Sequence, residues 1–193
     1  MQVSAPFYSQ HWDLDAWAAL GFANREAATY WQGSSCGILC LKMAVEGVSG
    51  RTIRPTAELI SHGVRFGAYD PKEGWKHSGL AKLAHLFGAA GIMLEPLLVA
   101  DVKGYLDAGC LPIVSITSAF EPQRTWKDRL FFWRKQKRGG HLALVTGYDA
   151  QGFYVHHTSV RPAYNWENRL ISFPVFEKGF AERGVVILPP AGG

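Results

Sequence analysis

Helical hydrophobic spacing fills the first half of the chain, and strand-like runs fill the second half. Apolar positions fit helices most clearly at 36–47 and 78–87, and shorter helices are expected at 13–20, 24–30, 56–62, 101–108 and 174–183. Strands are expected at 92–98, 111–118, 141–148, 153–157, 170–173 and 185–188. Since helices and strands do not alternate regularly, the order predicts an α+β fold and argues against a doubly wound parallel sheet.

The composition predicts one packed domain. The chain has 193 residues, 48% of them hydrophobic and 19% charged, which excludes wholesale disorder. No apolar run approaches the ~20 residues that span a bilayer, and the first six residues lack a signal-peptide pattern, so we expect a cytoplasmic protein. Three cysteines are too few for a disulfide scaffold, and their odd number leaves at least one free thiol.

A cysteine opens the predicted helix at 36–47, directly after a polar, glycine-bearing loop. At a helix N-terminus, unpaired backbone N–H groups and the helix dipole favour a thiolate, so we expect a lowered pKa for Cys36. Gly37 is expected to leave room for a substrate backbone. The alternative interpretation, that Cys36 is a small buried core residue, is the more common one for an isolated cysteine.

A histidine begins the predicted strand at 141–148, after the pair Gly139-Gly140. An imidazole in this position can hold its ring against a thiol and later protonate a leaving amine. Cys36 and His141 are far apart in sequence, as the two halves of a cysteine nucleophile site usually are. Together they favour a nucleophile site over a structural cysteine.

Four stretches follow one another along nearly the whole chain: Ala5 to Gln10, Ser35 to Met43, Gly140 to Asp149, and Phe173 to Phe180. They resemble the opening strand, nucleophile helix, histidine strand and closing helix of papain-like cysteine peptidases related to the bacteriocin-leader (double-glycine) peptidase domain. The resemblance implies a nucleophile helix packed on a C-terminal antiparallel sheet. It also implies a peptide or protein substrate, with cleavage of a peptide or amide bond through an acyl-enzyme.

Residue by residue, the resemblance implies Cys36 as nucleophile, His141 as general base and a glutamine upstream of the cysteine in the oxyanion hole. Gln10 matches by its local sequence, whereas Gln32 competes because it lies only four residues before Cys36. We favour Gln10.

One family feature is missing. The family places an Asp or Asn after the second hairpin strand to orient the histidine, but 153–159 contains neither. The position falls on His157 or, less favourably, His156, and Asp149 and Asn165 are further candidates. We predict an active thiol hydrolase, a cysteine-type peptidase or amidase. Because an imidazole stabilises an imidazolium less than a carboxylate does, the alternative is a catalytically impaired binding protein on a papain-like scaffold that uses the basic aromatic segment 124–138 for an anionic partner.

The segment 124–138 holds seven basic residues and one acidic residue, a local charge of +6 within a chain of net charge +4. It also contains four aromatic residues: Trp126, Phe131, Phe132 and Trp133. We expect a basic aromatic insertion, at about 120–139 of a single domain 1–193, that forms a flap bordering the catalytic cleft. Weak contact with an anionic surface or partner ranks second, and nucleic-acid binding is disfavoured.

The sequence gives no positive evidence for a metal or a cofactor. Cys36, Cys40, His141 and His157 could be drawn as a zinc set, but a spacing of four on a helix is not the usual zinc knuckle. Cys40 and Cys110 are therefore expected to be structural. Trp75 and His77, just before the helix at 78–87, are weaker candidates for the border of the groove.

Overall fold

The computed structural model describes residues 1–117, 140–159 and 166–190. The basic segment 124–138, most of the insertion expected at about 120–139, and the candidate Asn165 lie outside the described residues.

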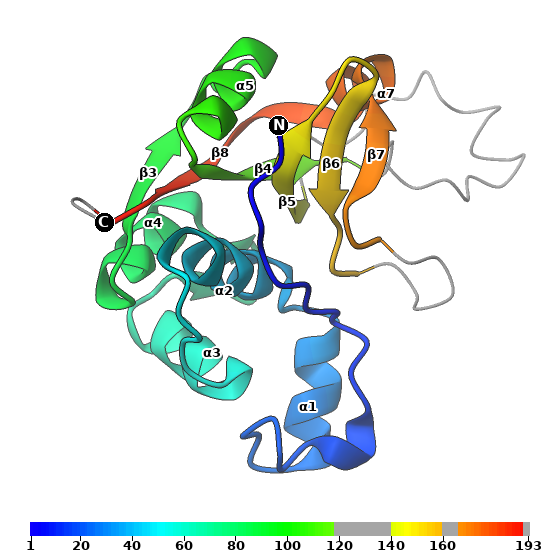
Figure 1. Ribbon diagram of the computed structural model, residues 1–193. Coiled ribbons are helices and arrows are strands. Elements are labelled where there is room, and N and C mark those ends of the chain that lie inside the picture. Colours follow the sequence, from blue (N-terminus) through cyan, green and yellow to red (C-terminus); the bar gives the residue numbers. More distant parts are fainter. Residues whose placement is uncertain (118–139, 160–165, 191–193) are drawn as a thin grey trace, which may run out of the picture.

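The described chain forms a mixed helical and antiparallel β structure (Figure 1). The helices are η1 (Leu14–Ala16), α1 (Arg25–Gln32), α2 (Cys36–Ser49), α3 (Thr56–Arg65), α4 (His77–Leu86), α5 (Val99–Asp107) and α7 (Phe173–Gly179). The strands are β1 (Tyr69–Asp70), β2 (Gly74–Trp75), β3 (Ala90–Leu94), β4 (Leu111–Ile116), β5 (His141–Tyr148), β6 (Gly152–His156), β7 (Arg169–Ser172) and β8 (Phe180–Leu188). β1 pairs with β2, and the other six strands form an antiparallel sheet of order β3-β8-β4-β5-β6-β7. The predicted α+β class is confirmed.

The six-stranded sheet lies between two hydrophobic layers. Successive side chains of a strand point to opposite faces. In β5, Leu142 and Leu144 therefore pack with α2, α3 and α4, whereas Ala143 and Val145 pack with α5 and α7. Both faces of the sheet are covered, which explains why its central strands are almost wholly apolar.

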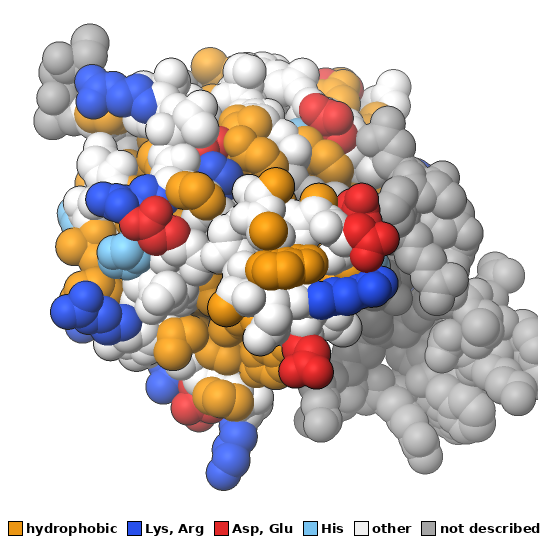
Figure 2. Space-filling view, turned by 90° about the horizontal axis from the view of Figure 1, so that it is seen from below, with side chains coloured by type: hydrophobic (Ala, Val, Ile, Leu, Met, Phe, Trp, Pro, Cys, Tyr) orange, Lys and Arg blue, Asp and Glu red, His pale blue; other side chains and the backbone are white. Residues whose placement is uncertain are grey.

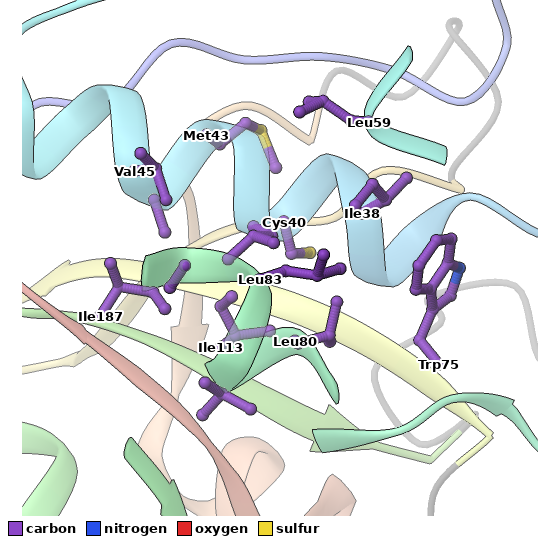
Figure 3. Close-up of a cluster of buried hydrophobic side chains, with 14 of the residues drawn as sticks. Ile38, Cys40, Met43, Val45, Leu59, Trp75, Leu80, Leu83, Ile113 and Ile187 are labelled. Carbon is purple, nitrogen blue, oxygen red and sulfur yellow. The ribbon is translucent and has the colours of Figure 1, made fainter. Parts of the chain in front are cut away.

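Helix α2 is the centre of the first layer. Every residue from Gly37 to Glu46 is buried, as expected for a helix that is largely apolar on all sides. Figure 3 shows α2 side chains such as Ile38, Cys40 and Met43 above residues of α4 and the sheet. Each fully buried side chain of this size contributes roughly 1.5–3 kcal/mol, so the core holds the start of α2 firmly. Cys40 is a core residue, as expected.

Two predicted boundaries near the C-terminus were wrong. The helix predicted at 174–183 ends at Gly179, and the strand predicted at 185–188 already begins at Phe180. Pairing of Phe180 with Ile116 and of Gly184 with Val114 recruits this stretch into β8. Sheet pairing with a central strand outweighed the local helical pattern, as tertiary context often does.

The other differences are local. Helix η1 spans only three residues of the stretch predicted at 13–20. Strand β3 ends at Leu94, not at residue 98, since Pro96 has no N–H for a ladder. The hairpin of β1 and β2 was not predicted, because strands of two residues carry no readable periodicity.

The N-terminal segment joins the sheet to the helices. The Val3 N–H donates to the Thr146 carbonyl at 2.7 Å, and the segment then passes α2 on its way to η1 and α1 (Figure 1). The opening strand implied for 5–10 does not form, but Gln10 N–H donates to the Thr158 carbonyl at 2.8 Å. This bond fixes Gln10 beside the chain that leaves β6.

The helical end of the molecule presents a mixed surface. Figure 2 shows hydrophobic side chains there bordered by both acidic and basic ones. Within the residues that the structure describes, none of the helices combines the length and the hydropathy needed to cross a membrane.

Candidate active site

Cys36 is the first residue of α2, and its partly exposed side chain lines a cavity. Burial by surrounding protein atoms raises the pKa of the thiol, and backbone hydrogen bonds at Leu142 and Gly37 lower it by less. The expectation of a lowered pKa was therefore wrong, because desolvation of the thiolate outweighs the helix N-terminus.

His141 is the first residue of β5 and lines the same cavity as Cys36. Its Nε2 lies 3.1 Å from the hydroxyl oxygen of Ser159. Burial, with a smaller electrostatic contribution from His157, lowers the pKa of His141 to about 3. The imidazole is thus neutral at physiological pH.

The cavity measures about 590 Å³ and is lined by both Cys36 and His141. The backbone hydrogen bond at Leu142 links the residue after His141 to the Cys36 sulfur. Residues of the β1–β2 hairpin, the start of α4 and the strand ends complete the wall: Tyr69, Pro71, Lys72, Glu73, Gly74, Trp75, Lys76, His77, Ser115 and Arg183. Trp75 and His77 thus lie where the sequence placed them as weaker candidates.

Gly37 has a different role from the one expected. A Cβ at this position would lie 2.6 Å from Cβ and Cγ of Trp75. The missing side chain therefore admits the indole of β2 rather than a substrate backbone. The Trp75 ring forms the wall beside Cys36.

The two candidate glutamines are held differently. Gln10 is 2% exposed, its amide donates to the Gln32 carbonyl at 2.9 Å, and its side-chain oxygen accepts from the Thr158 hydroxyl at 2.7 Å. The Gln32 side chain donates to the Trp12 carbonyl at 2.7 Å. Gln10 thus bridges the last residue of α1 and the segment after β6, whereas the Gln32 side chain faces the N-terminal segment. Neither belongs to the described lining of the cavity.

His157 lies beside His141, with ring centroids 4.6 Å apart and planes tilted by 36°. It is 2% exposed, and burial lowers its pKa to about 4. Its Nδ1 is 3.5 Å from the Ser159 hydroxyl oxygen. The ring centroids of His157 and Trp166 are 5.1 Å apart. The sequence-based candidate is adjacent to the base, but it does not bond to it directly.

Two other candidates for orienting His141 lie elsewhere. His156 is bonded at both ring nitrogens, to the Ala5 carbonyl at 3.2 Å and to the Asn168 N–H at 2.9 Å. The Asp149 carboxylate accepts from two backbone N–H groups and from Tyr154 in the turn after β5, at the opposite end of the strand from His141. The structure therefore excludes both from contact with the base.

Sequence reasoning missed three residues at the site. Ser159 follows β6 and bonds to His141. Ser115 is paired with Leu142 across β4 and β5, and its hydroxyl lies 2.8 Å from Nε2 of His77. Tyr69, on the unpredicted hairpin, lines the cavity. No motif marks a lone serine or tyrosine in a sequence, so only spatial placement identifies them.

In the described ranges, no three or more His, Cys, Asp or Glu side chains are placed to hold a metal ion. The zinc arrangement drawn from Cys36, Cys40, His141 and His157 is therefore not assembled. Cys40 instead points its thiol toward the Leu142 carbonyl, at 3.5 Å.

No family model matches the sequence, and no curated protein matches it. Solved structures do match over most of the chain. A double glycine motif protease from an AMS/PCAT transporter, solved in complex with its leader peptide, is 12% identical, with a TM-score of 0.57 over 97% of this chain and 94% of that one.

Two further structures give the same result. A structure described as a C39-like peptidase from Bacillus anthracis is 13% identical, with a TM-score of 0.58 over 95% of this chain and 94% of that one. The peptidase domain of Streptococcus ComA, a bifunctional ABC transporter of a quorum-sensing pathway, is 15% identical, with a TM-score of 0.55 over 81% and 93%. The chain therefore has the papain-like cysteine peptidase fold of the double-glycine peptidase domains.

Proposed function

We propose that the protein is a cysteine peptidase or amidase in which Cys36 is the nucleophile and His141 the general base. The observation that carries this proposal is the convergence of the first residue of α2 and the first residue of β5 on one cavity. The backbone hydrogen bond at Leu142 supports it, because it ties the residue after the base to the nucleophilic sulfur.

The shifted pKa values favour a resting pair of neutral thiol and neutral imidazole. With Nε2–H of His141 bonded to Ser159, Nδ1 is the nitrogen free to accept a proton. In the proposed reaction Nδ1 takes the Cys36 proton as sulfur attacks the carbonyl carbon. The imidazolium then protonates the leaving amine, and water hydrolyses the thioester to release the acid and restore the thiol.

The developing oxyanion needs donors near the sulfur. We assign the backbone N–H of Cys36 and the side-chain amide of Gln10 to this role. Gln10 is favoured over Gln32 because its amide is fixed between the end of α1, four residues before Cys36, and the segment that follows β6. The Gln32 side-chain amide donates to the Trp12 carbonyl in the N-terminal segment.

A peptide is the substrate class that we propose. The solved protease that shares this fold was crystallised with a leader peptide, and the cavity of about 590 Å³ is large enough for a few residues of an extended chain. Its rim combines the rings of Tyr69 and Trp75 with the charged side chains of Lys72, Glu73 and Lys76.

The second candidate function is a binding protein that has lost efficient catalysis. The raised pKa of Cys36 favours it, and so does the lack of a carboxylate beside His141 among the residues that the structure describes, since both weaken a thiolate–imidazolium pair. The two functions differ in whether an acyl-enzyme forms.

The test is a peptide-library digest followed by mass spectrometry, with wild type, Cys36→Ala, His141→Ala and Cys110→Ala compared. A hydrolase loses cleavage by at least about 10³-fold in the first two variants and keeps it in Cys110→Ala, whose thiol lies away from the cavity. A peptide aldehyde should add its mass to Cys36 alone. Absence of both cleavage and adduct in wild type would exclude the hydrolase and leave the binding protein.

A further inference from the structure

We infer that Ser159 is the positioning residue of the base: its hydroxyl holds Nε2–H of His141 and passes the hydrogen bond on to Nδ1 of His157. This relay of a hydroxyl and an imidazole would replace a single orienting carboxylate or amide. The inference rests on the proposed function of Cys36 and His141, and it deepens that function by naming what fixes the imidazole.

The distances support this order. The Ser159 oxygen is 3.1 Å from Nε2 of His141 and 3.5 Å from Nδ1 of His157. No ring nitrogen of His157 is bonded to a ring nitrogen of His141; the two ring centroids lie 4.6 Å apart, with the planes tilted by 36°. Among the described residues, Ser159 is thus the side chain that can fix the rotation of the His141 ring.

The direction of the hydrogen bonds follows from what each group can donate. A hydroxyl has one hydrogen and accepts through its lone pairs. If it donates to the neutral Nδ1 of His157, it must accept from His141, which places the His141 proton on Nε2. That tautomer leaves Nδ1 unprotonated, as a general base requires. In this arrangement the Ser159 hydroxyl, as acceptor, selects the productive tautomer of His141.

The surroundings hold the relay in place. The Ser159 backbone carbonyl lies 2.9 Å from Nε2 of His11. His157 is 2% exposed and Trp166 is also 2% exposed, so the far end of the relay is shielded from water. Thr158, which lies between His157 and Ser159 in the sequence, holds Gln10 by two hydrogen bonds. One three-residue segment therefore places both the base and the proposed oxyanion amide.

The relay carries no negative charge. Ser159 is neutral, and His157 is a neutral imidazole near pH 7, because burial lowers its pKa to about 4. The relay can therefore orient His141, but it stabilises the imidazolium formed during the reaction less than a carboxylate would. This explains how the site can keep its geometry when the stretch 153–159 offers no Asp or Asn.

The experiment compares Ser159→Ala, Ser159→Thr and His157→Ala with the matched control Ser61→Ala, an exposed serine of α3. Ser159→Ala should lower kcat by on the order of 10- to 100-fold with KM nearly unchanged, since a hydrogen bond to a group that becomes charged is lost. Ser159→Thr should restore most of the activity. His157→Ala should lower kcat less than Ser159→Ala.

A second readout does not need a substrate. Nitrogen-15 NMR of wild type should show His141 with its proton on Nε2, and Ser159→Ala should mix the two tautomers. A wild-type protein with the proton on Nδ1, or a Ser159→Ala variant with unchanged kcat and tautomer, would overturn the inference. If wild type cleaves no peptide, the proposed function fails, whereas the tautomer measurement still decides the role of Ser159.

Discussion

The indole N–H of Trp75 donates to the backbone carbonyl of Ser34, two residues before Cys36, at 2.6 Å. This bond joins the β1–β2 hairpin to the loop that leads into the nucleophile helix. Glycines at positions 37 and 63 make room for the ring. The wall of the cavity beside the thiol is thus set by one tryptophan packed against two helices.

A methyl group at Gly63 should displace this ring. The added Cβ of Gly63→Ala would lie 2.4 Å from Cζ3 and 2.7 Å from Cη2 of Trp75. Overpacking of this kind costs about 1–3 kcal/mol, which denaturant unfolding measures. The control is Gly104→Ala in α5, where a Cβ meets nothing within 4 Å and should stabilise the helix by about 0.5–1 kcal/mol. Equal shifts in the two variants would show that Trp75 moves freely.

Alkylation of Cys36 should require alkaline pH. Burial raises the pKa of the thiol, and the neutral His141 supplies no positive charge to form an ion pair. With Cys40 and Cys110 replaced by alanine, the iodoacetamide rate should rise steadily above pH 8.5, the usual thiol range, without a plateau at lower pH. A plateau between pH 5 and 7 that disappears in His141→Ala would instead establish a preformed thiolate–imidazolium pair.

Loss of the Gln10 amide should slow the reaction step more than substrate binding. An oxyanion donor acts mainly in the transition state, so Gln10→Ala should lower kcat by about 10²–10³-fold with little change in KM. Gln32→Ala is the matched comparison, and it should change kcat far less because its amide is bonded to Trp12. The opposite ranking in steady-state assays would assign the role to Gln32.

Acid should destabilise the fold. The pKa of His141 is lowered to about 3 and that of His157 to about 4, so the unfolded chain binds these protons at higher pH than the folded protein does. Stability should therefore fall as pH drops from about 6.5 towards 4, with proton uptake on unfolding by both groups. His77 and His156, whose pKa values are also lowered, add in the same direction.

The pH dependence of the unfolding free energy measures this uptake. His157→Gln should reduce its slope between pH 6 and 4 by about one proton. An unchanged slope in His157→Gln would mean that His157 titrates alike in both states.

The sequence by itself determined the α+β class and pointed to Cys36 and His141 as the two principal residues of the candidate site. Long periodic segments such as α2 follow from local apolar spacing that the tertiary packing here reinforces. Cys36 and His141 stand out because a helix and a strand begin at them, and helix and strand beginnings leave readable glycine and polar signals.

Only the tertiary structure decided which side chains contact one another at the site and in which direction their pKa values shift. Burial reversed the expected direction of the Cys36 pKa, because desolvation depends on atoms contributed by distant segments. The choice of Ser159 over His156 and Asp149 as the contact of His141 depends on where β5 and β6 end in space. Likewise, strand pairing drew Phe180 into β8 against its helical pattern. Local spacing specifies the elements, but non-local packing fixes what each side chain touches and therefore its chemistry.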